Sequence, residues 1–225
     1  MSPYLALATS LVLLGIAIWI WEAGHDYDEP ARLLLVWLVF SAATAMFAAA
    51  GMWIGDATVS LSFTAVARIL FLVVTFLLFL FARSFSARAD YTVLFWSVPL
   101  QFGMAVIMVN WQSMFESNAD IWVMRTWNPA AMCVMAVGWF YGILSLVYAV
   151  ILYLTLRREG RDKEKSRTLM MIAAMAVLFV AGAARNVPSA ATSYATSAVY
   201  LGYLLGLLML LWALRGPIVF KSTRR

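Results

Sequence analysis

The strongest constraint on this chain is a series of long, uninterrupted apolar runs. Residues 3–23 and 61–82 are two examples, and each has about the 20 residues that a helix needs to cross a bilayer. Strands of a membrane barrel would be about half as long and would alternate apolar with polar residues. Since only helices and closed barrels satisfy every backbone polar group in lipid, these runs predict an all-α polytopic membrane protein.

Composition and span count predict a single domain. Apolar residues make up 64% of the chain and charged residues 12%, against about one half and one quarter in soluble domains. The first seven residues carry no Lys or Arg, so the first run is read as an uncleaved span and not as a signal peptide. We therefore expect residues 1–225 to form one seven-transmembrane helix bundle. The expected spans are residues 3–23, 33–55, 61–82, 92–111, 130–156, 168–184 and 198–214.

Basic residues predict how this bundle is oriented. If the N-terminus is outside, thirteen of the sixteen Lys and Arg residues fall in cytoplasmic segments, whereas Arg125 and Arg185 fall in outer ones. This positive-inside bias predicts a multi-pass protein of the cell membrane (plasma or inner) with its N-terminus out and its C-terminus in. We assign the net charge of +5 to topology and contact with bilayer lipid, so nucleic acid is not an expected partner.

Polar residues near the outer ends of the spans predict a ligand pocket. Arg68 lies about two turns inside the third expected span, and charged residues at such depth are costly and often functional. The hypothesis is an outward-facing pocket for an apolar or weakly anionic ligand, closed by the Trp-containing loop 112–129. The alternative is a structural ion pair between Arg68 and Asp56. The pocket candidates are Arg68, Asp56, Trp53, Asn110, Arg185 and Tyr194.

The charged segment 157–167 is the candidate contact site on the cytoplasmic side. It holds six basic and three acidic residues and is interpreted as a helix extension with neighbours four residues apart. A separate membrane or cytoplasmic protein could dock there. The candidate contact residues are Arg157, Arg158, Arg161 and Lys163.

Small residues at a spacing of four predict close helix packing. The pairs are Gly51 with Gly55, Gly138 with Gly142, and Gly202 with Gly206. In lipid, helices associate through such close approaches. We favour packing within one bundle, and a homodimer seam is the alternative.

Enzymatic and cofactor chemistry is not expected. The chain has one cysteine, Cys133, and one histidine, His25, which excludes a bis-histidine haem or a multi-histidine metal site within one chain. Common nucleotide-binding and hydrolase motifs are missing from the sequence. The last expected span has no lysine for a retinal Schiff base. We therefore expect a protein without catalysis, metal or cofactor.

Several stretches resemble the seven-helix N-terminal membrane sensor domain of prokaryotic histidine kinases. They are WLVFS at 37–41, VARILF at 66–71, GWFY at 138–141 and GYLLG at 202–206. The resemblance implies a sensor-type role in signal transduction, and here the chain ends about ten residues after the last span, without an effector domain. The expected function is thus receptor-like, through a separate partner. The alternatives are a structural subunit of a larger membrane complex and, less favoured, a small transporter.

Overall fold

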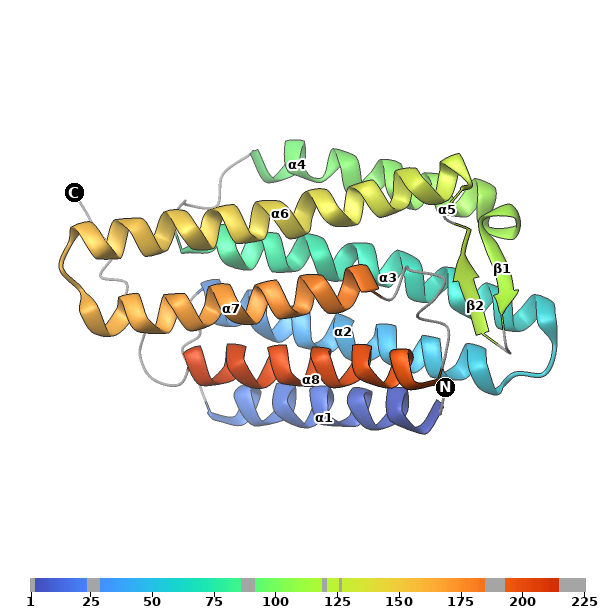
Figure 1. Ribbon diagram of the computed structural model, residues 1–225, viewed down its shortest axis with the longest axis horizontal. Helices are drawn as coiled ribbons and strands as arrows, with labels where there is room; N and C mark the ends of the chain where they lie inside the picture. Colours follow the sequence, from blue (N-terminus) through green and yellow to red (C-terminus); the bar gives the residue numbers. More distant parts are fainter. Residues whose placement is uncertain are drawn as a thin grey trace.

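The computed structural model describes residues 3–23, 29–85, 92–118, 121–125, 127–184 and 193–214. Within these ranges the chain forms helices and one short β-hairpin (Figure 1), which confirms the all-α prediction. The elements are α1 (Pro3–Ala23), α2 (Glu29–Trp53), α3 (Ala57–Ser84), α4 (Thr92–Trp96), α5 (Val98–Met114), β1 (Phe115–Asn118), β2 (Ile121–Met124), α6 (Pro129–Arg158), α7 (Asp162–Ala184) and α8 (Ser193–Leu214).

The described helices run up and down one bundle, with α4 and α5 sharing a single pass (Figure 1). The hairpin lies at one end of the bundle, where α1 begins, and the turn between α6 and α7 lies at the opposite end, where α8 ends (Figure 1). Most helices extend a few residues beyond the spans expected from hydropathy, and polar residues cap two of them, α3 and α6. Asn128 caps α6 by accepting from the amides of Ala130 and Ala131, with Pro129 at the favoured first position.

Five described helical segments are long and apolar enough to cross a membrane. They are Arg32–Trp53, Ala57–Ser84, Thr92–Met114, Pro129–Arg158 and Glu164–Gly182. The other two passes contain shorter apolar stretches, Tyr4–Trp19 and Ala198–Ala213. Large apolar side chains also cover the exterior: Val109 is 81% exposed and Trp19 is 66% exposed. Such a surface is unfavourable in water and is suited to lipid.

Of the three apolar clusters among the described residues, the two larger hold most of the bundle together. One joins α1, α2, α3, α6, α7 and α8 around Leu38, Ala149 and Leu210. The other joins α3, α5, α6 and the hairpin around Phe79, Ile107 and Tyr141. Because α3 and α6 contribute to both clusters, they form the shared wall of the bundle.

Glycines permit the closest helix contacts, as their spacing indicates. A Cβ atom at Gly142 on α6 would lie 2.3 Å from Cδ2 of Phe179 on α7, and one at Gly206 on α8 would lie 2.8 Å from Cγ of Leu178. By contrast, a Cβ at Gly55 would meet nothing within 4 Å. The interpretation as packing within the bundle is therefore confirmed at Gly142 and Gly206.

The segment 112–129, expected to be a loop that closes the outer pocket, begins as a continuation of α5 and then forms a hairpin. Phe115 pairs with Met124, and Ser117 pairs with Trp122. The indole Nε1 of Trp122 donates to the hydroxyl of Ser60 at 3.0 Å, and Ser60 in turn donates to the carbonyl of Gly51. The hairpin is thereby fastened to α3 and, through Ser60, to α2.

The fourth expected span is broken between α4 and α5. Pro99 has no amide proton to donate, and its ring would clash with the carbonyl four residues earlier in a regular helix. The hydroxyl of Tyr141 on α6 donates to the carbonyl of Trp96 and accepts from the amide of Leu100 at 3.0 Å. A side chain inserted into the helical hydrogen-bond ladder is a recognised cause of kinks, so Tyr141 satisfies both backbone groups at the break.

Candidate functional site

The predicted outer pocket residues lie apart from one another. Asp56 serves as the N-cap of α3, where its carboxylate accepts from the amide of Val59 at 2.9 Å. Twelve residues of helix separate it from Arg68, which amounts to about 18 Å along the axis. An arginine side chain cannot cover that distance, so the alternative of an Arg68–Asp56 ion pair is wrong. Trp53 is half exposed and packs edge-on against the ring of Tyr4.

The remaining outer candidates do not gather around Arg68. Arg68 itself is buried near the middle of α3 and is engaged with other groups. Asn110 on α5 donates to the carbonyl of Val106, one turn earlier in the same helix. Arg185 lies outside the described residues, and for Tyr194 the structure describes the backbone at the start of α8 but not the side chain. Neither of the two pockets described below is lined by any of these residues.

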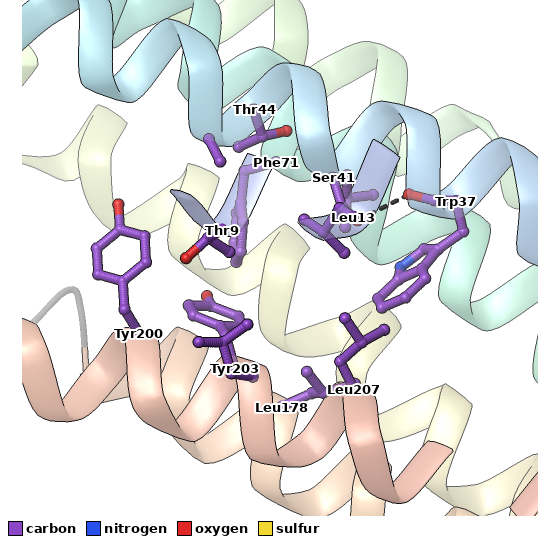
Figure 2. Close-up of a pocket in the computed structure, with 13 residues that line it drawn as sticks. Thr9, Leu13, Trp37, Ser41, Thr44, Phe71, Leu178, Tyr200, Tyr203 and Leu207 are labelled. Carbon is purple, nitrogen blue, oxygen red and sulfur yellow. Dashed lines mark hydrogen bonds between the residues drawn. The ribbon is translucent and has the colours of Figure 1, made fainter. Parts of the chain in front are cut away.

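A pocket does occur, but deeper in the bundle, between α1, α2, α3, α7 and α8. We call it the central pocket; about 600 Å³ of space, including space open to the outside of the bundle, lies between its side chains. Figure 2 shows Thr9 and Leu13, Trp37 and Ser41, and Tyr203 and Leu207 converging on it from three different helices. None of the described residues that line it is charged.

Three hydroxyls of the central pocket have hydrogen-bond acceptors, whereas the indole N–H of Trp37 has none in the described part of the chain. The hydroxyls of Thr9, Ser41 and Thr44 each donate to the backbone carbonyl four residues earlier, at 2.7–2.8 Å. The side chain of Trp37 is 5% exposed, and its Nε1 has no hydrogen-bond acceptor within the described part of the chain. An unmet buried donor costs about 1–3 kcal/mol. A bound acceptor would remove this cost.

A second pocket, which we call the lateral pocket, lies between α3, α6 and α7. It holds about 610 Å³, and Trp139 on α6 borders it while remaining half exposed on the outside of the bundle. Gly138, Gly142 and Gly182 lie along it, so the backbones of α6 and α7 form part of its wall. Trp37, Phe71, Val74, Leu178 and Tyr203 line both pockets.

The cytoplasmic contact candidates lie around the turn between α6 and α7. The segment 157–167, expected as a helix extension, is helical at 157–158 and 162–167 and is broken at residues 159–161. Gly160 has a φ of +69° and ends α6. Its amide donates to the carbonyl of Arg157, and the amide of Arg161 donates to that of Leu156, which is the Schellman pattern. Arg157 and Arg158 are exposed at the end of α6. The side chain of Lys163 is not among those described.

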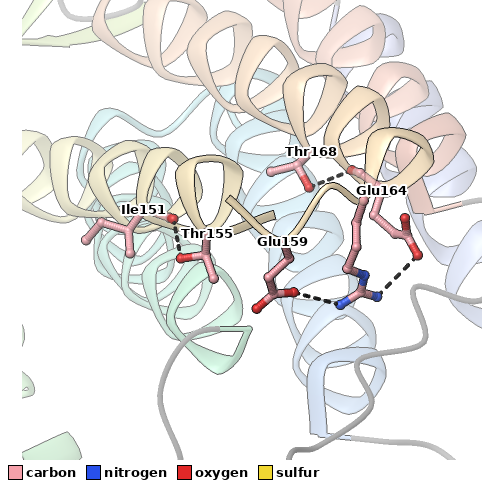
Figure 3. Close-up of polar contacts among 6 residues, drawn as sticks. Ile151, Thr155, Glu159, Glu164 and Thr168 are labelled. Carbon is pink, nitrogen blue, oxygen red and sulfur yellow. Dashed lines mark hydrogen bonds and ion pairs between the residues drawn. The ribbon is translucent and has the colours of Figure 1, made fainter. Parts of the chain in front are cut away.

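Arg161 is occupied within this turn. Its guanidinium lies 3.5 Å from a carboxylate oxygen of Glu159 and 3.2 Å from one of Glu164 (Figure 3). Lys165 similarly pairs with Asp162, which lowers the pKa of the Asp162 carboxyl through a hydrogen bond and through charge attraction. Among the candidates whose side chains the structure describes, Arg157 and Arg158 are thus better placed than Arg161 for an outside partner.

Sequence reasoning missed the central pocket, although Trp37 carried a signal. Trp residues of membrane proteins concentrate at the two interfaces, whereas Trp37 lies in the interior of an apolar run. A buried indole N–H usually has a hydrogen-bond acceptor, so the position of Trp37 raises the question of which group accepts from it. The pocket residues on α1 and α8 are far from Trp37 in the sequence, so the sequence alone does not show that they line one pocket with it.

No protein-family model, curated protein sequence or solved structure matches this chain.

Proposed function

We propose that the chain crosses the cell membrane seven times, with its N-terminus outside and its C-terminus in the cytoplasm. Five segments meet the requirements of length and apolarity, and α1 and α8 supply the remaining passes. Arg32, Arg83, Arg157 and Arg158 lie at the end of the bundle that holds the α6–α7 turn, whereas Arg125 lies at the hairpin end (Figure 1). This asymmetry supports the orientation.

Cysteine labelling in intact cells tests this topology. In a Cys133→Ser background, Ser117→Cys places a thiol in the exposed part of the hairpin, and Lys163→Cys places one in the α6–α7 turn. A membrane-impermeant maleimide should label the first in intact cells and the second after permeabilisation. Labelling of the Lys163→Cys variant from outside would reverse the orientation.

Within this topology, we propose a receptor-like function without catalysis. The observation that carries it is the central pocket, an apolar space in the bundle with the unmet donor of Trp37 at its wall. A ligand shifts an equilibrium between two helix arrangements by the difference in its affinity for them. α7 and α8 line the pocket, and α7 leads to the exposed Arg157 and Arg158. A separate partner there would receive the change, consistent with the resemblance to prokaryotic sensor domains.

The single broken helix does not favour a transporter. Transporters place the ends of discontinuous helices at the substrate site. Here the break at α4–α5 is closed by Tyr141, and no residue of α4 or α5 lines either pocket.

Purification in mild detergent tests the receptor proposal against that of a structural subunit. The wild-type protein should carry an apolar small molecule, detectable by native mass spectrometry. Ala45→Leu fills the central pocket and should abolish this occupancy. Ala136→Leu adds the same side chain at an exposed position of α6 and should leave occupancy unchanged. A stable stoichiometric complex with another protein and no bound molecule would favour the structural subunit.

A further inference from the structure

The two pockets are adjacent and share one wall. Trp37, Phe71, Val74, Leu178 and Tyr203 belong to both linings. The central pocket extends from this wall toward α1 and α8, and the lateral pocket extends from it toward α6 and α7. The two pockets therefore lie side by side, and Trp37 belongs to the wall between them.

The lateral pocket is bordered by a residue of α6 that lies partly on the outside of the bundle. Its lining includes Trp139, which is half exposed, and Ile143 one turn further along α6 is 52% exposed. These positions lie within the apolar length of α6 and away from its charged end. The pocket is therefore bordered there by apolar surface, and a molecule that entered on this side would arrive from lipid.

The walls define which chemistry can occupy the two pockets. Among the described lining residues none is charged, which disfavours an ionic ligand because a buried charge needs a partner. The protons of Thr9, Ser41 and Thr44 are already donated to backbone carbonyls. The N–H of Trp37 is a buried donor without an acceptor in the described part of the chain, and it requires one.

We propose that the two pockets form one continuous site for an apolar molecule bearing a carbonyl oxygen. The carbonyl accepts a hydrogen bond from Nε1 of Trp37, the apolar body fills both pockets, and access is from the bilayer between α6 and α7. This inference rests on the proposed receptor function and specifies the class of ligand and its route.

The indole proton of Trp37 provides a direct test. The protein is labelled with ¹⁵N at its Trp indoles in lipid nanodiscs, and Trp37→Phe identifies the Trp37 resonance by its loss. The probes are 2-undecanone and undecane, which differ in the carbonyl. The ketone should shift the Trp37 resonance downfield and saturably, whereas undecane should produce no such shift.

Affinity provides the second readout. One hydrogen bond at a buried site corresponds to about a five- to tenfold change in Kd. Wild-type protein should therefore bind 2-undecanone about five- to tenfold more tightly than Trp37→Phe does, and the two proteins should bind undecane equally. An unshifted Trp37 resonance, or equal ketone affinity in the two proteins, would overturn the inference. If undecane still binds saturably in that case, the proposal of a ligand pocket stands and the proposal of a carbonyl-bearing ligand fails.

The route is tested with two matched glycine substitutions. Gly138 lines the lateral pocket, and an added Cβ there would be in van der Waals contact with Cε1 of Phe71 at 3.8 Å without a clash, so a larger side chain would occupy part of the pocket. Gly15 on α1 has nothing within 4 Å. Gly138→Leu and Gly15→Leu gain the same helix propensity, but the first narrows the lateral pocket. Ketone association should slow severalfold in Gly138→Leu alone, and equal rates would contradict access between α6 and α7.

Discussion

The amide of Leu100 donates to the hydroxyl of Tyr141, 3.0 Å away on another helix. In an unbroken helix this amide would donate to the carbonyl of Trp96, and that carbonyl instead accepts from the same hydroxyl. One side chain thus replaces a missing link of the helical ladder. The arrangement matters because a membrane offers no water to satisfy either group.

Removal of that hydroxyl should weaken the fold. Tyr141→Phe keeps the buried ring but leaves the two backbone groups unmet, and we expect a loss of about 1–3 kcal/mol in the free energy of unfolding. Reversible unfolding in mixed micelles measures it. Tyr148→Phe, on the same helix with a partly buried ring, should cost less. Equal stabilities of the two variants would show that the break is satisfied in another way.

The hairpin should depend on Trp122. Trp122→Phe removes the hydrogen bond to Ser60 while retaining an aromatic ring, and a net contribution of about 1 kcal/mol predicts roughly fivefold faster hydrogen exchange in the β1–β2 amides. Trp127→Phe is the control, because Trp127 is exposed and contacts Arg125 through its ring face. Faster exchange in both variants, or in neither, would argue against Trp122 as the fastening point.

The contact between Gly142 and Phe179 should be intolerant of added volume. Gly142→Ala places a Cβ against the ring of Phe179, and overpacking of this kind costs about 1–3 kcal/mol, more than the helix propensity gained. The double variant with Phe179→Leu should recover most of the loss in a double-mutant cycle. Gly15→Ala, at an open position, should not destabilise. Additive effects of the two changes would contradict a direct clash.

The α6–α7 turn should depend on the backbone of Gly160. An added Cβ there would meet no neighbour, but a φ of +69° disfavours residues with a side chain by about 1–2 kcal/mol. Gly160→Ala should therefore destabilise the protein through strain alone. Gly160→Asn should cost less, because Asn tolerates this conformation better. Thermal unfolding of both variants measures the difference, and equal losses would rule out backbone strain as the cause.

Local features of the fold were readable from the sequence because they depend on neighbouring residues. The first expected span, 3–23, coincides with α1, since continuous apolarity determines where such a helix begins and ends. The hairpin was missed because its two strands have four residues each. The run IWVM at 121–124 does carry β propensity, but residues 112–129 were expected to form a loop over the outer pocket.

The candidate site was less predictable because it depends on which helix faces meet. Trp37 and Tyr203 line the same space, yet no pattern within α2 or α8 indicates that they face each other. Arg68 drew attention as an intramembrane charge, and its proximity to Asp56 in sequence suggested a pair that the helical rise does not permit. Asp56 instead caps α3, a role that its position before an apolar run could have suggested.

The hydrogen bonds of Tyr141 on one side of the bundle and the two pockets on the other give the two sides different stiffness. On the side of α5 and the hairpin, Tyr141 and Trp122 connect neighbouring segments, whereas the other side, formed by α1, α2, α3, α6, α7 and α8, surrounds the two pockets. Empty volume is what hydrostatic pressure removes, so the second side is the compressible one. Deformation of this protein should therefore be carried by α7 and α8, and the tied side should serve as the fixed frame against which they move.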